Sequence, residues 1–282
     1  MQTQTQTQTQ TQTQTQTQTQ TIHPTAIISE GAKLAPSVTV GPYCIIGPNV
    51  VIGEGCKLLS HVVMEGHLTI GENNTFYQFC SIGAPPQDIG YKGEPTRVQI
   101  GNNNIFREYV SIHRGTTKQD HVTIIGNDSF FMAYVHIAHD VIIGNKVIIV
   151  NTVNLAGHVK VGDFCIIGGG TNISQFITLG KGAYIGGGSG IDKDIPPFCT
   201  AYGNRIHLKG INIIGLKRRG HSRQTISELV DFYRTMESSA LSPRAFVDKE
   251  VMNSDDYKDN VPIQELAQFI KSSETGIAPF FT

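Results

Sequence analysis

The stretch VGPYCIIGPNVVIGEGCKLL (40–59) places an aliphatic side chain at every sixth position. The same spacing extends in both directions, from Ile22 to Ile191, and comprises 26 hexads with two interruptions. A helix with 3.6 residues per turn would spread these side chains around its whole surface, so the period excludes a helix. A six-residue repeat predicts a parallel β-helix, in which each hexad forms one short strand and a bend, and three hexads form one coil.

Two segments break the repeat and are candidate loops. Residues 83–99 place Asp88 and Glu94 where inward aliphatic side chains would fall, and residues 113–124 shift the register by one. A solenoid ejects insertions as loops from one edge, which is often the binding edge. We therefore expect both segments to leave the rod near a functional site. The alternative is a polar surface loop without function.

The chain divides into three regions. Residues 1–21 are dominated by alternating Gln and Thr, and we expect them to be disordered because they have almost nothing apolar to bury. Residues 22–196 carry the hexads and form the predicted β-helix domain. Residues 197–282 lose the repeat. The predicted fold class is therefore all-β, a parallel β-helix of hexapeptide repeats, with a C-terminal α-helical domain.

The C-terminal region shows helical spacing. Residues 222–237 place apolar side chains three or four positions apart, and shorter helices are expected at 243–251 and 262–272. Ser242 and Asn260 stand near the starts of the shorter helices, as capping residues do. We expect these helices to cap the last coil, whose strand edges would otherwise be unpaired.

The composition excludes several functions. The chain of 282 residues has 22 basic and 23 acidic side chains, and its net charge of −1 gives no general attraction to nucleic acid or anionic membranes. No apolar run approaches the roughly 18 residues of a membrane span. The five cysteines are odd in number and lack zinc-site spacing, which favours buried thiols in a reducing compartment and a cytoplasmic protein.

The 18-residue coil predicts which polar side chains lie above one another. The resulting columns at one corner of the rod contain His139, Gly157 and Gln175, then Asp140 and His158, and nearby His136. A histidine is the usual general base at neutral pH, and an adjacent carboxylate orients it and stabilises the imidazolium. Gly157 lacks a Cβ and can offer its N–H to an oxyanion. These parts suit acyl transfer to a hydroxyl without a protein nucleophile.

The same residues have other interpretations. Three imidazoles from neighbouring coils can hold zinc, as in the hexapeptide-repeat carbonic anhydrases. A lone histidine on a rod face is usually only solvated. The basic run GLKRRG (215–220) suits phosphate oxygens, an acidic partner protein or a solvated turn. Nucleic acid is not an expected partner, because no basic face with interleaved aromatic side chains is present.

Eight motifs, in order along the chain, resemble those of one enzyme family. They are HPTAII (23–28), HVVMEGH (61–67), GEPTRV (93–98), SIHRGT (111–116), HIAHD (136–140), LAGHV (155–159), IPPF (195–198) and GINIIGLKRRG (210–220). The family is that of the acyl-ACP:UDP-N-acetylglucosamine O-acyltransferases, which begin lipid A synthesis. The resemblance implies a left-handed β-helix and a homotrimer with active sites between subunits. It also implies transfer of a 3-hydroxyacyl group from acyl carrier protein to the sugar 3-hydroxyl, with no cofactor or metal.

The resemblance also assigns roles by position. His139 corresponds to the general base, Asp140 to its orienting partner and Gly157 to the oxyanion donor. Residues implied in binding the sugar, the acyl chain and the nucleotide are Asp88, His136, His158, Gln175, Asn212, Arg218 and Arg219. Gly187 falls at the position of the family's hydrocarbon ruler, where a glycine suggests room for a longer acyl chain.

Three positions depart from the family pattern. Ser174, Gly90 and Ile214 stand where His, Lys and Glu are common. The loss of a cation and a carboxylate near the ligands leaves the identity of the sugar open. A related hexapeptide N-acyltransferase, or an enzyme that takes a 3-amino sugar nucleotide, therefore remains an alternative.

Overall fold

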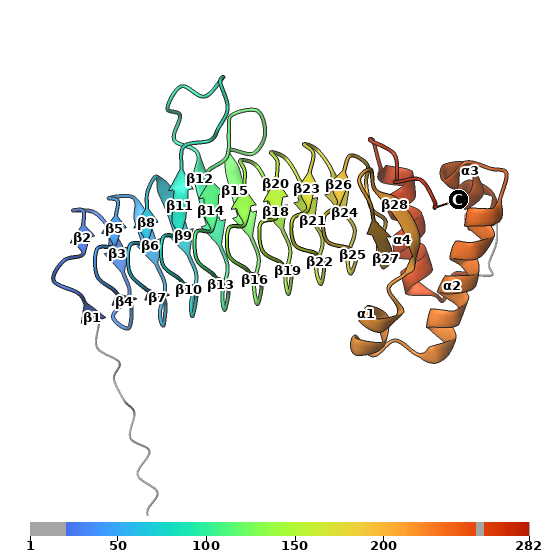
Figure 1. The fold of residues 1–282 in the computed structure, drawn as a ribbon, viewed down its shortest axis with the longest axis horizontal. Coiled ribbons are helices and arrows are strands. Elements are labelled where there is room, and N and C mark those ends of the chain that lie inside the picture. Colours follow the sequence, from blue (N-terminus) through green and yellow to red (C-terminus); the bar gives the residue numbers. More distant parts are fainter. Residues whose placement is uncertain (1–20, 252–256, 282) are drawn as a thin grey trace, which may run out of the picture.

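The computed structural model describes residues 21–251 and 257–281. Apart from Thr21, the Gln-Thr tract predicted to be disordered lies outside the described residues. The described chain forms a long rod of short strands with a group of helices at its C-terminal end (Figure 1).

The rod consists of strands β1 to β26, one for each predicted hexad, in three parallel sheets. Sheet A contains β1 (Thr21–Ile22), β4 (Thr39–Val40), β7 (Lys57–Leu58), β10 (Thr75–Phe76), β13 (Ile105–Phe106), β16 (Phe130–Phe131), β19 (Ile148–Ile149), β22 (Ile166–Ile167) and β25 (Tyr184–Ile185). Sheet B contains β2 (Ile27–Ile28), β5 (Ile45–Ile46), β8 (Val63–Met64), β11 (Ser81–Ala84), β14 (Ser111–His113), β17 (His136–Ile137), β20 (Asn154–Leu155), β23 (Asn172–Ile173) and β26 (Gly190–Ile191). Sheet C contains β3 (Lys33–Leu34), β6 (Val50–Ile52), β9 (His67–Ile70), β12 (Arg97–Ile100), β15 (Val122–Ile125), β18 (Ile142–Ile143), β21 (Lys160–Val161) and β24 (Thr178–Leu179).

The register of the sheets confirms the predicted 18-residue coil. In sheet B, His136 pairs with Asn154, which in turn pairs with Asn172. The hexad aliphatics of the rod interior point inward and form one continuous core. Inside the rod, the ring of Phe106 stacks on Phe76 at 4.7 Å and on Phe131 at 4.8 Å between centroids. This spacing is that of neighbouring β-strands, so each coil buries its apolar residue directly against the next.

Two loops leave the rod at the same edge (Figure 1). The first ejected loop (85–96) joins β11 to β12, and the second ejected loop (114–121) joins β14 to β15. Both are shorter than the predicted segments, 83–99 and 113–124, because the ends of those segments form strands. β12 pairs in continuous register with β9 and β15, so the loops absorb the irregular chain length without disturbing the sheet.

Two strands and a short helix follow the repeat. β27 (Cys199–Tyr202) pairs parallel with β25, and β28 (His207–Ile211) pairs antiparallel with β27, so that both extend sheet A. The short helix α1 (Ile213–Arg218) comes directly after β28. The hexad pattern did not predict these elements, because none of them follows the six-residue period.

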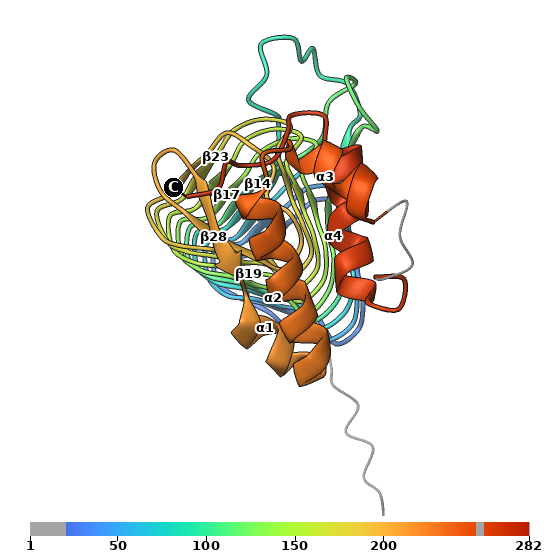
Figure 2. The ribbon, with the colours of Figure 1, turned by 90° about the vertical axis from the view of Figure 1, so that its right-hand side faces the viewer.

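The three predicted helices are present. They are α2 (Arg223–Ser238), α3 (Pro243–Glu250) and α4 (Val261–Ser272). Ser242 and Asn260 are the N-caps of α3 and α4, and each accepts a hydrogen bond from a first-turn backbone N–H. The helices lie across the end of the rod (Figure 2), in the place where the sequence predicted a cap. In the described part of the chain, no helix has the length and apolar character needed to cross a membrane.

Candidate active site

The turn between β17 and β18 holds His139 and Asp140 at the corner where sheets B and C meet. Asp140 adopts a left-handed backbone conformation with φ of 60°, which aspartate tolerates better than most residues. Its N–H donates to Oγ1 of Thr123 at 2.9 Å. Nδ1 of His139 donates to Oδ2 of Asp140 at 2.9 Å, because an ionised carboxylate can only accept. In the neutral imidazole the proton is therefore on Nδ1, and Nε2 carries the lone pair of a base.

Asp140 is completely buried, yet its carboxylate is well satisfied. The backbone N–H of Thr116 donates to Oδ1 at 2.9 Å, and the Thr116 hydroxyl donates to Oδ2 at 2.6 Å. Burial alone would raise the pKa of Asp140, but the hydrogen bonds from His139 and Thr116 outweigh it and lower the pKa. The carboxylate therefore stays ionised and supports a positive charge on His139.

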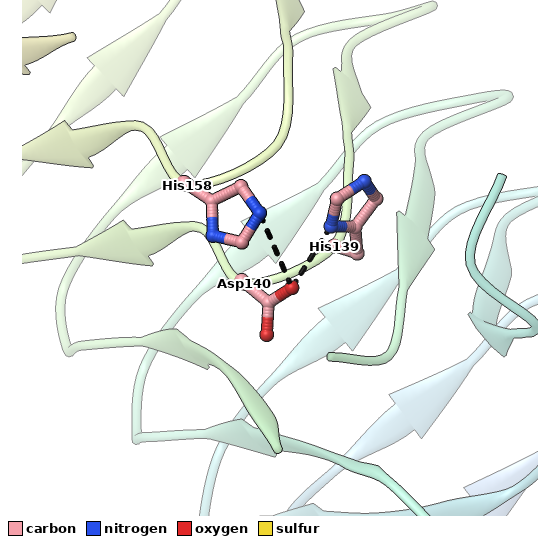
Figure 3. Close-up of side chains that lie close together, drawn as sticks. All are labelled: His139, Asp140 and His158. Carbon is pink, nitrogen blue, oxygen red and sulfur yellow. Dashed lines mark hydrogen bonds and ion pairs between the residues drawn. The ribbon is translucent and has the colours of Figure 1, made fainter. Parts of the chain in front are cut away.

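His158 lies one coil further along, on the other side of the same carboxylate. Its Nε2 is 3.8 Å from Oδ2 of Asp140, so both imidazoles face one oxygen (Figure 3). Nδ1 of His158 bonds to Oε1 of Gln119 at 2.7 Å, and the ring stacks on Phe176 at 4.5 Å. Burial lowers the pKa of His158. The ring is thus held in place and favours its neutral form.

Gly157 lies directly against the imidazole of His139. A Cβ at this position would lie 2.8 Å from Nε2 and 3.0 Å from Nδ1 of His139, and closer still to Cε1. Only a glycine leaves room for the ring. Among the residues that the structure describes, none accepts a hydrogen bond from the Gly157 N–H. This N–H therefore has no acceptor within the described chain, and its contact with an oxyanion stays a prediction.

A cleft of about 400 Å³ opens on sheet B beside this pair. Its lining includes His136, His139, Gly157 and Gln175, so the structure brings these four predicted residues together. Nδ1 of His136 hydrogen-bonds to Oγ of Ser111 at 2.8 Å, and burial lowers the pKa of His136. The cleft therefore has a base, an unpaired N–H donor and polar side chains along one wall.

Asp88 approaches the corner from the first ejected loop. Its Oδ2 pairs with Nζ of Lys118 at 2.6 Å, and its Oδ1 accepts from the N–H of Gly90 at 2.7 Å. The hydrogen bond from Lys118 and that from Gly90 lower the pKa of Asp88, to which the charge of His139 also contributes. The two ejected loops thus meet over the site, and the predicted link between loops and site is supported.

The remaining predicted residues lie on another face. Asn212, Arg218 and Arg219 line a cleft of about 970 Å³ over sheet A, which shares no lining residue with the first cleft. Asn212 caps α1, and its Nδ2 donates to the Gly182 carbonyl at 3.0 Å. Nε and Nη2 of Arg219 are buried without a hydrogen-bond partner in the described chain. Within one chain, the structure does not bring these residues to His139.

The cleft beside His139 is not lined by the other positions singled out from the sequence. Gly187 is exposed at the bend between β25 and β26, at the corner of sheets A and B. Ile214 is 65% exposed on the rim of the second cleft. Ser174 is exposed next to Gln175.

A metal centre of three imidazoles does not form among the described residues. The group with possible ligand atoms close together is His139, Asp140 and His158, whose atoms lie within 4.8 Å of one another. Oδ2 of Asp140 already accepts hydrogen bonds from His139 and Thr116. His136, the third histidine of the zinc interpretation, is paired with Ser111 instead.

Sequence reasoning expected the second ejected loop near the site but did not identify which of its residues reach it. Thr116 holds Asp140, Lys118 pairs with Asp88, and Gln119 bonds to His158. Polar residues in a segment already suspected of function were the only available signal. An insertion has no period, so spacing alone did not show where these side chains return to the rod.

Comparisons with known proteins give one consistent family. The model described as UDP-N-acetylglucosamine O-acyltransferase, domain 2, matches residues 194–278, and the bacterial transferase hexapeptide model matches residues 21–54 and 123–157. The chain is 50% identical over 260 residues to the acyl-[acyl-carrier-protein]–UDP-N-acetylglucosamine O-acyltransferase of Thermodesulfovibrio yellowstonii, covering 91% of this chain and 98% of that protein. It is 57% identical over 258 residues to the protein of the same name from Sulfurihydrogenibium, covering 92% and 94%. The structure of LpxA from Acinetobacter baumannii matches with a TM-score of 0.88 and 45% identity, over 91% of this chain and 99% of that one.

Proposed function

Since the chain belongs to the family of acyl-[acyl-carrier-protein]–UDP-N-acetylglucosamine O-acyltransferases, we propose that it performs the first step of lipid A synthesis. In that step a 3-hydroxyacyl group passes from acyl carrier protein to the 3-hydroxyl of UDP-N-acetylglucosamine. The rod is a left-handed parallel β-helix, as in the structures it matches. The observation that carries the proposal is the His139–Asp140 pair, which faces a cleft beside the unpaired N–H of Gly157.

His139 acts as the general base. Its Nδ1–H is bonded to Asp140, and in the described chain no group bonds to Nε2. Nε2 removes the proton of the sugar hydroxyl while the oxygen attacks the thioester carbonyl. Asp140 holds the ring in this tautomer and stabilises the imidazolium that forms. No residue of the protein is acylated, because the acceptor oxygen attacks the donor directly.

Gly157 supplies the oxyanion contact. As the new C–O bond forms, the thioester oxygen becomes negative and accepts a hydrogen bond from the N–H of Gly157, which lines the cleft and has no acceptor in the described chain. Collapse of the tetrahedral intermediate breaks the C–S bond and releases the thiolate of acyl carrier protein. The imidazolium of His139 then returns its proton to that sulfur, and the base is restored.

The surrounding side chains orient the acceptor sugar and the acyl chain. His136, Gln175 and His158 lie around the base, and Asp88 reaches it from the first ejected loop. The family pattern has a lysine at position 90, where this chain has the uncharged Gly90. Here the ammonium of Lys118 pairs with the carboxylate of Asp88. The sugar site thus keeps one cation beside one acidic group. The residue at position 187 sets the maximum length of the acyl chain. Because Gly187 has no side chain, it leaves room for a long chain.

The nucleotide end of the acceptor is assigned to Asn212, Arg218 and Arg219. Arginine suits the bidentate recognition of phosphate oxygens. These residues and His139 occupy different sheets of one chain, so a single chain offers two half-sites. A cyclic homotrimer places sheet A of one subunit against sheet B of the next, because its interfaces join unlike surfaces. That arrangement completes each active site between subunits.

We assign the protein to the cytoplasm. All five cysteines are buried free thiols, which agrees with a reducing compartment. Acyl carrier protein and a sugar nucleotide are also substrates that such a compartment supplies.

The test is product analysis. The purified protein is incubated with a mixture of 3-hydroxyacyl carrier proteins of different chain lengths, together with UDP-N-acetylglucosamine or its 3-amino analogue, and the products are identified by mass spectrometry. The proposal expects an ester of UDP-N-acetylglucosamine. An amide formed only from the 3-amino analogue identifies the alternative acceptor. The absence of any acylated sugar nucleotide with either acceptor would refute acyl transfer to these acceptors.

A further inference from the structure

The second ejected loop turns back into the rod at Asp140. Thr116 is only 3% exposed and Asp140 is completely buried, so water cannot replace their contacts. The Thr116 backbone N–H donates to Oδ1 at 2.9 Å, and its hydroxyl donates to Oδ2 at 2.6 Å. One residue therefore holds both oxygens of the carboxylate, and it comes from a loop that lies outside the repeat.

The hydroxyl of Thr116 shares its acceptor atom with the base. Oδ2 of Asp140 also accepts from Nδ1 of His139 at 2.9 Å. With Oδ1 held by the backbone and Oδ2 by the hydroxyl, the carboxylate plane cannot rotate. The direction in which Oδ2 faces His139 is therefore set by Thr116, and this direction sets where Nε2 points in the cleft.

We propose that Thr116 is a positioning residue of the acyl transfer, which acts through Asp140 to orient His139. This inference rests on the proposed function, in which His139 is the base. Thr116 does not line the cleft that contains His139 and Gly157, so it acts on the base without touching the substrate. Its role is confined to turnover and does not extend to substrate binding.

Few titratable groups of the described chain lie close to Asp140. The titratable groups that face Asp140 are His139 from the same turn and His158 from the next coil, at 2.9 and 3.8 Å from Oδ2. From the ejected loops, Lys118 and Asp88 act on His158 with opposite signs. Removal of the Thr116 hydroxyl changes none of these charges. It removes one hydrogen bond that lowers the pKa of Asp140, so this pKa rises.

The experiment compares Thr116→Val, Thr116→Ala and Thr116→Ser with Thr171→Val. Valine keeps the shape and the backbone N–H of Thr116 but lacks the hydroxyl, whereas serine keeps the hydroxyl. Thr171 is a matched control, because it is completely buried in the rod and its hydroxyl makes only a 3.4 Å contact with the Gly186 carbonyl. For each variant kcat and KM are measured at neutral pH, and folding is checked by circular dichroism.

The expected result is a fall in kcat of roughly 10- to 100-fold for Thr116→Val, the cost of a lost hydrogen bond to a buried charge. The KM for the sugar nucleotide stays within about 2-fold, because no substrate contact is lost. Thr116→Ser restores kcat, and Thr171→Val leaves both kcat and KM unchanged.

Several results would overturn the inference. They are a Thr116→Val enzyme as active as Thr171→Val, a KM that rises as much as kcat falls, or a Thr116→Ser enzyme that is not restored. If Thr116→Val and Thr116→Ala fail to fold while Thr116→Ser folds, the hydroxyl serves only folding and the inference is wrong. The proposed function fails separately, when the wild-type protein itself forms no acylated sugar nucleotide.

Discussion

Gly157→Ala tests the geometry of the active site directly. The added Cβ would stand 2.8 Å from Nε2 of His139 and closer still to Cε1, whereas non-bonded atoms prefer about 3.5 Å, so the imidazole must retreat by more than about 0.7 Å. The ring cannot do so without loosening its 2.9 Å bond to Asp140 or turning toward His158. A displacement approaching 1 Å costs about 10²-fold in rate. We therefore expect kcat to fall about 100-fold or more.

Stability should respond differently. Gly157 does not have a left-handed backbone conformation, so alanine fits its φ and slightly restricts the unfolded chain. The clash with the ring should lower the free energy of unfolding by no more than about 1–3 kcal/mol, the usual cost of overpacking, so the chain stays folded. Gly47→Ala is the matched control on the same sheet, because its Cβ would approach Met64 O only to 3.3 Å, far from the site. Turnover is measured with acyl carrier protein and UDP-N-acetylglucosamine, and unfolding by circular dichroism. A Gly157→Ala enzyme with more than half of wild-type kcat would refute this geometry.

Three other variants probe different parts of the molecule. His139→Ala should lower kcat by roughly 10²- to 10⁴-fold in a steady-state assay and leave the circular dichroism spectrum unchanged, because the base faces the cleft and not the rod interior. Gly187→Met should lower kcat/KM for the longest accepted acyl chain by roughly 10-fold or more relative to a shorter one, in competition assays read by mass spectrometry. His113 is buried, which lowers its pKa to about 4, so the unfolded chain takes up a proton first as the pH falls below about 6.5. The free energy of unfolding of the wild type should therefore fall by up to about 3 kcal/mol between pH 6.5 and pH 4. His113→Gln should not show this loss, as measured by urea unfolding at both pH values.

The fold is readable from the sequence because one constraint recurs in every coil. Each inward residue such as Ile137 must be apolar, and its neighbour on the next coil, Leu155, meets it 18 positions later. The same period predicts that His139 lies beside Gly157, which the close approach of the two residues confirms. β27, β28 and α1 lie outside the period. The pairing of β27 with β25 and of β28 with β27 depends on contacts that no local pattern encodes.

The residues of the candidate site can be predicted only in part from the sequence, for a physical reason. Residues on the rod inherit their neighbours from the coil length, whereas residues in an insertion do not. Thr116 lies 24 positions before Asp140, a separation that is not a multiple of the 18-residue coil, and it reaches the carboxylate only because the loop folds back. The arginines of the second cleft are recognisable by their phosphate chemistry, but their face of the rod follows from how β28 leads into α1.

In the proposed reaction, the buried carboxylate beside the base requires the interruption of the repeat by the second ejected loop. A corner of the rod can bury a carboxylate only if hydrogen-bond donors replace the lost water, since an unsatisfied buried charge is strongly destabilising. The rod itself supplies Asp140 with His139, which in the proposed reaction gains a positive charge and then loses it. Donors that never change their charge have to come from elsewhere, and the second ejected loop provides them through Thr116. The regular coils thus set the spacing of the proposed base and oxyanion donor, whereas the irregular loop makes the buried carboxylate of Asp140 possible.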